Sequence, residues 1–326
     1  MNTEPKEFVR TKPDKLKQLV LRLAQQAGMP EEKADLLAGL LVKNDLRGNF
    51  SHGSIQIVRY AQIMRDGLIN PNPAVSITSD HGSTIVVDGD GGLGYFPASS
   101  AAEILVERCR THGIAAAVTR NHGHIGAAGI YSRFLAENGL IGYVTSGHQL
   151  TLKPEDSIMQ AAGGSPMSFA VPAGEAVPMV LDFGAMHDLY PDSPHVPELF
   201  NLAPGLVFRS MGIGYMCQAL GGFLAGVPVE EERAVRRYSG SNQGSLIIAL
   251  DINRFIPADA FKSEMDVYMR VTSQMKPMPG YEKATLPGVL ELQRMQAWSA
   301  EGIPLSLHNR QLLLDTAAEF GVEPLI

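Results

Sequence analysis

The stretch from Asn121 to Gly129, with His122 and His124 among three glycines, contains the residues best suited to chemistry. It follows a β-branched run and opens an alanine-rich helical run. Backbone N–H groups at a helix start are unpaired and carry partial positive charge, so this place suits a carboxylate or a phosphate. Gly126 and Gly129 let a ligand approach the backbone. A histidine here can serve as a general acid or base near neutral pH, and we expect a functional loop.

Two other interpretations of these histidines are weaker. His122 and His124 supply two metal ligands, but no third ligand follows at the spacing of a metal site, and H-E-x-x-H is absent from the sequence. A single loop histidine is ordinarily a surface residue. Two histidines among three glycines favour a function, and we expect no metal site.

Gly89, Gly91 and Gly94 form G-x-G-x-x-G between a predicted strand and a predicted helix, as in a dinucleotide-binding fingerprint. The fingerprint also needs an acid at the end of the next strand, which here ends in Thr119-Arg120. Because an arginine can bind a 2′-phosphate, this interpretation stays open. We favour a glycine-rich turn that fixes a strand-to-helix corner.

Ser51-His52-Gly53 lies where one predicted helix gives way to the next. Neighbouring side chains point apart in an extended segment and converge only in a turn, so the spacing is weak evidence for a serine nucleophile. The sequence contains no G-x-S-x-G motif. From the residues alone, His52 fits a helix cap as well as a core position.

Composition limits the classes of protein to which the chain can belong. Its 326 residues predict one large domain or two interlocked ones, and 45% apolar with 19% charged residues is a globular composition. Lys plus Arg (27) minus Asp plus Glu (34) gives a net charge of −7, which argues against nucleic acid and acidic membranes as partners.

Cysteine content and targeting signals favour a soluble protein of the cytoplasm. The two cysteines, Cys109 and Cys217, are too few for a disulfide framework or a zinc finger, and we expect buried thiols. The sequence shows no secretory signal and no apolar run long enough to span a membrane.

The elements that must position these residues follow an α/β pattern. Apolar spacing predicts a helix that carries Leu16, Leu19, Val20 and Leu23 and stops at Gly28, a second from Pro30 to near residues 44–48, and a third over about residues 53–66. The texture of the sequence changes at Pro71–Pro73. Beyond that point, strands are predicted at residues 84–87, 114–118, 140–144, 167–171, 177–181 and 245–251. Further helices are predicted at residues 98–110, 127–138 and 211–224, and from 258 to the C-terminus with a break at 277–280. The segment 184–205, with four prolines, is predicted as a loop.

Several motifs recur together over nearly the whole chain. They are Asp45-Leu46-Arg47-Gly48 running into Ser51-His52-Gly53, Tyr60, the Gly67–Asn70 turn, Asn-x-x-His-x-Gly-Ala-Ala-Gly ending at Gly129, Val180-Leu181-Asp182, Gly212-x-Gly214, Leu286-Pro287-Gly288 and Glu301-Gly302-Ile303. This set resembles the malate/L-lactate dehydrogenase family of the non-Rossmann type, which also includes ureidoglycolate, sulfolactate and cyclic-imine reductases.

The resemblance implies an α/β, non-Rossmann malate/L-lactate dehydrogenase-like fold. Helical N- and C-terminal parts, residues 1–73 and 256–326, are expected to pack together as a substrate and dimer domain. Residues 74–255 are expected to form the central nicotinamide-binding domain. Similar enzymes are homodimers with the active site in a cleft.

The resemblance also implies roles for particular residues. His124 matches the family's acid/base histidine, and Ser51, His52 and Asp182 match a polar relay. Cofactor-contacting positions correspond to Ile125, Gly126, Ser146, His148, Phe183 and Gly184. Substrate-contacting positions correspond to Arg47, Gln56 and Tyr60.

The sequence departs from the family at several of these sites. Gln56 stands where members handling 2-oxo acids typically have an arginine, which pairs with carboxylate. Met211 stands where a lysine usually supports the cofactor, and His148 stands where a serine is usual. Gly163-Gly164-Ser165-Pro166 replaces G-T-N-P. These changes predict altered binding of substrate and cofactor, or the loss of hydride transfer.

The favoured function is therefore NAD- or NADP-dependent hydride transfer to or from a small 2-hydroxy, 2-oxo or imino compound. Met211 and His148 weaken the expectation of cofactor binding. One alternative is a non-redox lyase, isomerase or hydratase that keeps His52 and His124 for proton transfer. The other is a non-catalytic paralogue that binds a metabolite.

Overall fold

The computed structural model describes residues 4–187, 189–190 and 193–326, which form two compact units. Unit 1 combines the chain up to Pro73 with the chain from Thr272, and unit 2 comprises Ala74–Val271. The second border lies at Val271 rather than at residue 255, because helix α8 (Ala258–Ser273) is tied to unit 2. There the Asp266 carboxylate accepts backbone N–H groups from residues 174, 175 and 176 at 2.9–3.1 Å.

The N-terminal part of unit 1 is a helical layer. Its helices are α1 (Pro13–Gln26), α2 (Glu31–Leu46) and α3 (Gln56–Arg65), and the short helix η1 (Phe50–His52) precedes α3. Pro13 at the first turn of α1 suits a helix start. Leu16, Leu19 and Leu23 share one buried face of α1, as their helical spacing predicts.

The C-terminal part of unit 1 completes this layer. It contains α9 (Val289–Glu301), β9 (Ile303–Ser306) and α10 (Leu307–Glu319), and β9 pairs antiparallel with β1 (Phe8–Thr11). Helix α10 contacts α1 and α3, and α9 contacts α2. The expectation that the two ends of the chain pack together is therefore confirmed. Neither short strand was predicted, because each depends on a partner nearly 300 residues away.

Unit 2 is built on a seven-stranded mixed sheet in the order β2-β3-β4-β8-β5-β6-β7. Only β3 and β4 pair in parallel, whereas a Rossmann sheet is mostly parallel. The predicted non-Rossmann α/β fold is thus confirmed. The strands are β2 (Ser76–Asp80), β3 (Thr84–Asp88), β4 (Ile114–His122), β5 (Leu140–His148), β6 (Pro166–Val171), β7 (Met179–Gly184) and β8 (Gln243–Asp251).

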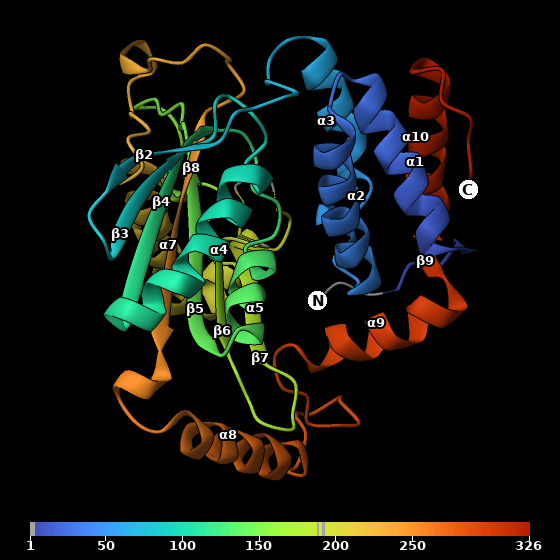
Figure 1. Cartoon of the computed structure of the whole chain (residues 1–326). Coiled ribbons are helices and arrows are strands. Elements are labelled where there is room, and N and C mark those ends of the chain that lie inside the picture. The colour runs from blue at the N-terminus through green and yellow to red at the C-terminus, as the bar shows by residue number, and fades with distance from the viewer. Residues whose placement is uncertain (1–3, 188, 191–192) are drawn as a thin grey trace. The chain divides into compact units, whose positions relative to one another are not determined.

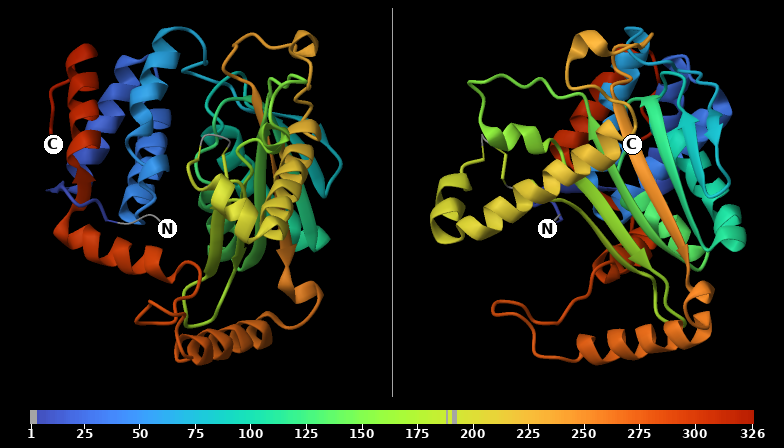
Figure 2. Two further views of the ribbon diagram at one scale, coloured as in Figure 1. Left: turned by 180° about the vertical axis from the view of Figure 1, so that it is seen from behind. Right: turned by 90° about the vertical axis from the view of Figure 1, so that its left-hand side faces the viewer.

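Helices cover both faces of this sheet (Figures 1 and 2). On one face α4 (Tyr95–His112) and α5 (Gly129–Glu137) bury a core that includes Ala117, Val144 and Ile247. On the other face lie α7 (Pro204–Cys217) and the π-helical turn η3 (Gln218–Phe223). The other helical segments are η2 (Ile158–Ala162), α6 (Val196–Leu202), η4 (Glu231–Arg233) and η5 (Ile252–Arg254).

Each strand predicted in unit 2 is present, but several ends differ. Strands β4 and β5 each run four residues further, because polar residues at their ends still pair with β8. The predicted loop at 184–205 was partly wrong, since it contains α6 and the first residues of α7. Pro191, one of its four prolines, lies outside the described residues. Strand β2 was missed because it is a largely exposed edge strand.

Candidate active site

The candidate site residues of unit 2 lie along one edge of its sheet. Strands β8 and β6 pair antiparallel with both of their neighbours, so β3, β4, β5 and β7 all run in the same direction. Their carboxyl ends therefore share an edge, which is where ligands bind in open α/β sheets. The segments at this edge are the glycine loop (89–94), the His124 loop (121–128), residues 146–148 and residues 182–184.

Two buried tyrosines, Tyr95 and Tyr131, hold the backbone of the His124 loop. The hydroxyl of Tyr131 donates to the carbonyl of Ile125 at 2.6 Å. Gly126 has a φ of 74°, and a Cβ at this position would lie 2.4 Å from the Tyr95 hydroxyl oxygen, so only glycine fits. The His124 side chain is half-buried. The loop therefore presents His124 immediately before the start of α5.

His122 has a different environment, because it is fully buried. Its Nδ1 lies 2.7 Å from the carbonyl of Gly123 and its Nε2 lies 2.7 Å from the Thr119 hydroxyl. A carbonyl only accepts, so Nδ1 carries the proton and Nε2 accepts from Thr119, whose oxygen accepts from Ser245 at 2.5 Å. Burial lowers the pKa of His122 to about 4, so the ring is neutral at pH 7.

Asp182 lies near the end of β7, at the start of α5. A Cβ at Gly129, the first residue of α5, would lie 2.5 Å from Asp182 Oδ2. A carboxylate at this position is stabilised by the positive end of the helix dipole. The structure thus brings Asp182 and the His124 loop to the same helix start.

The end of β5 carries Ser146, which is buried, and His148, which is half-buried. The Gln218 side chain accepts the backbone N–H of His148 at 3.2 Å and donates to the carbonyl of His148 at 2.7 Å. Burial lowers the pKa of His148. Neutral hydrogen-bonding groups therefore line this part of the edge.

Close backbone packing joins β5 to the π-helical turn η3. A Cβ at Gly147 would lie 2.5 Å from the backbone nitrogen of Gly222, and one at Gly221 would lie 2.4 Å from the carbonyl carbon of Ser146. Both positions therefore require glycine. Single π-helical turns frequently mark functional sites.

Met211, which stands where the family resemblance implies a lysine, has apolar surroundings. Its side chain is buried in an apolar cluster with Ala162, Met186, Leu189 and Val207. A lysine here would have to bury its ammonium group among these side chains. We therefore expect Met211→Lys to destabilise unit 2 rather than to strengthen cofactor binding.

In unit 1, Ser51 and His52 occupy the segment between α2 and α3, residues 49–55, which we name the His52 loop. The Ser51 hydroxyl lies 2.9 Å from His52 Nδ1, so the turn brings together two side chains whose spacing left the pair in doubt. Gln56 Nε2 donates to the carbonyl of Ser51 at 2.6 Å. His52 is half-buried, and burial lowers its pKa.

Two neighbouring residues at the end of α2 hold the His52 loop. Asn44 Nδ2 donates to the carbonyl of His52 at 2.9 Å, and Asp45 Oδ2 accepts the backbone N–H of Ser54 at 2.8 Å. A Cβ at Gly53 would lie only 1.8 Å from Asp45 Oδ1, so this position requires glycine. Asp45 is fully buried, and desolvation raises its pKa to about 7.

The predicted substrate residues lie on both sides of the His52 loop. Arg47 is the C-cap of α2 and is half-buried. Gln56 and Tyr60 lie one turn apart on the same side of α3, and Tyr60 is buried. Gln56 contacts the His52 loop directly through its hydrogen bond to the carbonyl of Ser51.

The residues that sequence reasoning missed are those that hold the two histidine loops. They are Asn44, Thr119, Gln218 and Ser245, and Asp45 was noted only as part of a motif. One signal was available for Asn44 and Asp45, because these two residues continue the buried face of α2 that includes Leu37 and Leu41. A polar side chain on an apolar face needs a partner when it is buried.

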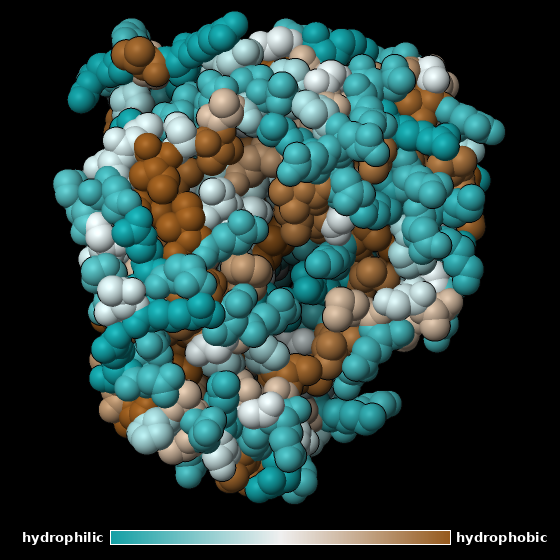
Figure 3. All heavy atoms as spheres, in the orientation of Figure 1, coloured by the Kyte–Doolittle hydropathy of each residue, from teal (hydrophilic) through white to brown (hydrophobic). Residues whose placement is uncertain are grey.

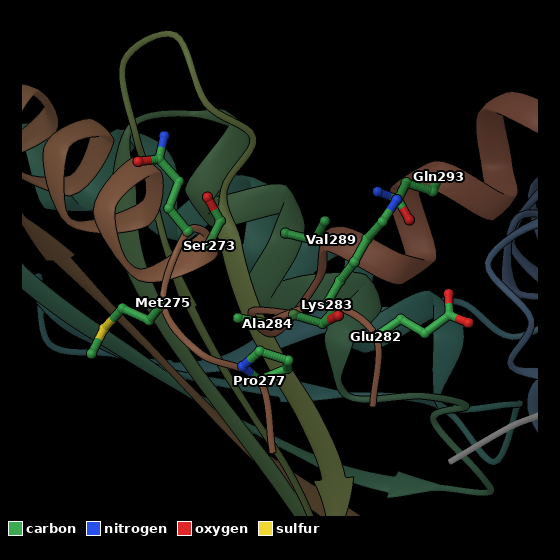
Figure 4. A pocket seen from close by; sticks show the side chains of 10 residues that line it. Ser273, Met275, Pro277, Glu282, Lys283, Ala284, Val289 and Gln293 are labelled. Atoms are coloured by element: carbon green, nitrogen blue, oxygen red, sulfur yellow. The ribbon is translucent and has the colours of Figure 1, made fainter. Parts of the chain in front are cut away.

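Two cavities of about 390 Å³ lie away from these residues. One is in unit 1, between the end of α8 and α9, where Ser273, Lys283 and Gln293 line it (Figure 4). The other is in unit 2 and borders the His124 loop only at Asn121, with Arg120 and Arg236 on its wall. Neither contains a predicted catalytic residue.

The described residues also bear on metals, membranes and thiols. They include no group of three or more His, Cys, Asp or Glu side chains that could hold a metal ion. No helix in the same part of the chain is long and apolar enough to cross a membrane. Cys109 and Cys217 are both free and buried, as predicted.

Comparison with known proteins connects this geometry to a family. The family model for malate/L-lactate dehydrogenase matches residues 11–186 and 201–313, which is most of the chain. The chain belongs to the malate/L-lactate dehydrogenase family. This membership confirms the predicted class, an oxidoreductase of the dehydrogenase and reductase type.

Relatives match this family member over nearly its full length. It is 26% identical to the malate dehydrogenase of Pyrococcus horikoshii, over 98% of this chain and 97% of the relative. The structure of that enzyme covers 99% of both chains with a TM-score of 0.85. The L-sulfolactate dehydrogenase of Methanocaldococcus jannaschii is 26% identical over 95% of this chain and 97% of its own. An NAD(+) ureidoglycolate dehydrogenase of Escherichia coli is 24% identical over 93% and 94%.

Proposed function

We propose that the protein transfers hydride between a nicotinamide cofactor and a small 2-hydroxy, 2-oxo or imino compound, with His124 as the acid/base. The observation that carries this proposal is the position of the His124 loop. In a chain of this dehydrogenase family, the loop lies at the carboxyl edge of the sheet and immediately before a helix start. The named relatives oxidise hydroxy acids of several kinds, which supports this substrate class.

In this proposal His124 moves a proton while the cofactor supplies or accepts the hydride. During reduction, the imidazole donates to the oxygen or nitrogen that gains charge, and in the reverse direction it accepts that proton. The fixed backbone around His124 favours this role, because efficient proton transfer needs a group held within hydrogen-bonding reach. Asp182 lies at the same helix start as the His124 loop, where it would act as a polar neighbour of this loop.

The residues at the sheet edge fit a flat, uncharged ring better than they fit a phosphate. Ile125, Gly126, Ser146, His148, Phe183 and Gly184 would hold the cofactor, and these segments contain no Lys or Arg. A Cβ at Gly184 would have its nearest contact at 3.3 Å, with the carbonyl oxygen of Gly164, so this rim is more open than the packed glycines. We propose NAD or NADP as the cofactor and infer that its phosphates gain little from this edge.

Unit 1 would contribute the substrate contacts. Arg47 is the cation of this predicted set, and Gln56 offers an amide where relatives that bind 2-oxo acids place a guanidinium. Because Gln56 already donates to the Ser51 carbonyl, its amide orients the His52 loop as well. We propose a substrate with a neutral polar group near Gln56, or with its acid close to Arg47.

A titration tests the cofactor part of this proposal. NADH and NADPH are added separately to the protein, and the fluorescence of the nicotinamide is followed. We expect saturable binding of one of them, followed by turnover of a 2-oxo acid or cyclic imine. Binding of neither would favour the non-redox lyase, isomerase or hydratase that uses His52 and His124 for proton transfer alone. Binding without turnover of any compound would favour the non-catalytic paralogue.

We further propose that the protein is a homodimer in the cytoplasm. The face in Figure 3 is mainly hydrophilic, whereas α7, which is behind the sheet in that orientation, exposes Leu206, Ile213 and Met216 on one stripe. Exposed apolar stripes of this kind mark interfaces. Analytical ultracentrifugation should show a dimer that Met216→Glu shifts toward monomer. A wild-type monomer would contradict this proposal.

A further inference from the structure

The glycine loop, residues 89–94, has no role in the proposed reaction. Backbone hydrogen bonds nevertheless join it to the His124 loop and to Arg120 just before that loop. Four backbone hydrogen bonds join the segment 120–124 to the glycine loop. They run from the N–H of Gly89 to the carbonyl of Arg120 (2.9 Å), from Gly91 to Asn121 (2.9 Å), from Gly94 to His124 (3.0 Å), and in the opposite direction from Gly123 to Gly92 (2.8 Å). The carbonyl of His124 itself is therefore held.

Steric fit explains why these positions are glycines. A Cβ at Gly94 would lie 2.6 Å from the carbonyl oxygen of Gly123 and 2.7 Å from His122 Nδ1. A Cβ at Gly89 would lie 2.8 Å from the Cβ of His122. These contacts are with the backbone or with the buried side chain of His122. Neither group can move aside easily to make room for a Cβ. The first and third glycines of the G-x-G-x-x-G motif thus match the shape of this region, whereas a Cβ at Gly91 would lie 2.2 Å from the ring of Tyr238.

A buried polar chain supports the same loop. His122 Nδ1 donates to the carbonyl of Gly123 at 2.7 Å, while its Nε2 accepts from Thr119, whose hydroxyl is bonded to Ser245. The backbone of Gly123, which joins the two histidines, is therefore fixed through its N–H by the glycine loop and through its carbonyl by His122. The strands β4 and β8 carry Thr119 and Ser245, so the sheet anchors this chain.

We infer that the glycine loop and the His122–Thr119–Ser245 chain are positioning elements that fix His124 for proton transfer, and that the loop is not a phosphate site. In a dinucleotide fingerprint, backbone N–H groups face the pyrophosphate. Here the N–H groups of Gly91 and Gly94 are donated to carbonyls of the His124 loop, and that of Gly89 to the carbonyl of Arg120 just before this loop. The inference rests on the proposed function, because it assigns these residues to the placement of the proposed acid/base.

The first test uses Gly94→Ala, with Gly205→Ala as its matched control. Gly205 lies in α7 of the same unit, and its Cβ would meet nothing within 4 Å. In the unliganded protein, hydrogen–deuterium exchange of the peptides that cover residues 89–94 and 121–128 should rise in Gly94→Ala and stay unchanged in the control. With a substrate that the wild type turns over, kcat should fall by about 10- to 100-fold, because small displacements of a catalytic group have effects of this size. The KM for NADH or NADPH should change far less than kcat.

A second pair of variants keeps the test decisive where Gly94→Ala does not fold. Thr119→Val removes the hydroxyl that His122 accepts from, while Thr119→Ser retains it. We expect Thr119→Val to raise exchange in the His124 loop and to lower kcat, and Thr119→Ser to restore both. Rescue by the hydroxyl would identify positioning through His122, since loss of packing alone would not be restored by the smaller serine.

The outcomes separate this inference from the function on which it rests. Raised KM for NADH or NADPH with an unchanged kcat in Gly94→Ala would make the loop a cofactor site and overturn the inference. Unchanged exchange and kcat in both Gly94→Ala and Thr119→Val would also overturn it. Failure of the proposed function appears elsewhere, as an unchanged rate in His124→Asn, while the exchange data still report whether these residues fix the loop.

Discussion

The His124 loop in unit 2 and the His52 loop in unit 1 each present a half-buried histidine, but different groups hold them. Around His124, the restraints are backbone hydrogen bonds, glycines and a neutral buried chain. Around His52, they are the side chains of Asn44 and Asp45, of which Asp45 can titrate. Because a buried acid changes charge near neutral pH and hydroxyls do not, the two loops should respond differently to pH.

The comparison also suggests different roles for the two histidines. A loop held by backbone groups and by a histidine whose pKa is about 4 keeps these restraints near neutral pH, which suits the residue that exchanges protons with substrate. A loop held by an ionisable residue can change its restraint with pH. We therefore expect His52 to matter less for the chemical step than His124, and more for the dependence of activity on pH.

The largest expected effect separates the two histidines in catalysis. His124→Asn should lower kcat by about 10²- to 10⁴-fold, because it removes the proposed acid/base, whereas His52→Asn should have a smaller effect. Steady-state kinetics measures this, and far-ultraviolet circular dichroism confirms that both variants fold. Equal losses in the two variants would remove the distinction between the loops.

The next effect tests how tightly the His52 loop is packed. Gly53→Ala puts a Cβ into the space of Asp45 Oδ1 and should lower the free energy of unfolding by about 2 kcal/mol. Gly39→Ala in α2 is the control, because its Cβ would meet only the flexible end of Lys17 at 3.8 Å. Urea denaturation measures both variants. A Gly53→Ala protein as stable as wild type would show that the loop is not held by Asp45.

A substitution at Gln56 tests the predicted specificity. Gln56→Arg gives unit 1 the guanidinium that relatives use, and should raise kcat/KM for 2-oxo acids about tenfold, the effect of a charge-assisted hydrogen bond. Gln56→Lys, which has the charge without the bidentate geometry, should gain less. If the wild type already reduces pyruvate or oxaloacetate as well as Gln56→Arg does, Gln56 does not determine specificity.

The last two effects are opposite in sign and concern pH. The pKa of Asp45 is raised from 3.8 to about 7, so between these values the folded state keeps a proton that the unfolded state has lost, and this carboxyl makes stability fall as pH rises. The pKa of His122 is lowered from 6.5 to about 4, so its contribution to stability rises with pH over that range. Each slope is at most about 1.4 kcal/mol per pH unit.

Two variants separate these slopes. Asp45→Asn keeps an oxygen for the Ser54 N–H but cannot titrate, so its unfolding free energy relative to wild type should increase from pH 4 to pH 7. His122→Gln should show the reverse trend from pH 4 to pH 6.5. Chemical denaturation at a series of pH values measures both, and parallel trends would contradict the assigned environments.

The sequence determined much of the fold and pointed to the candidate site. Leucine spacing predicted the helices of unit 1, and β-branched runs predicted the strands that form the middle of the sheet, because burial imposes these periods on any chain. The Asn121–Gly129 stretch was recognisable as a site because strand, glycines and helix start follow one another along the chain. Such a pattern can be recognised from the sequence because it depends only on neighbouring residues.

Tertiary structure decided which residues hold that site. Only strand pairing places Thr119 beside Ser245, 126 residues away, and only the approach of the glycine loop to the His124 loop shows that its N–H groups are already used. The same holds for Met211, because only the fold shows that it is buried among apolar side chains. Hydrogen bonds and packing between distant segments depend on the positions of both partners, and local sequence patterns specify only one partner at a time.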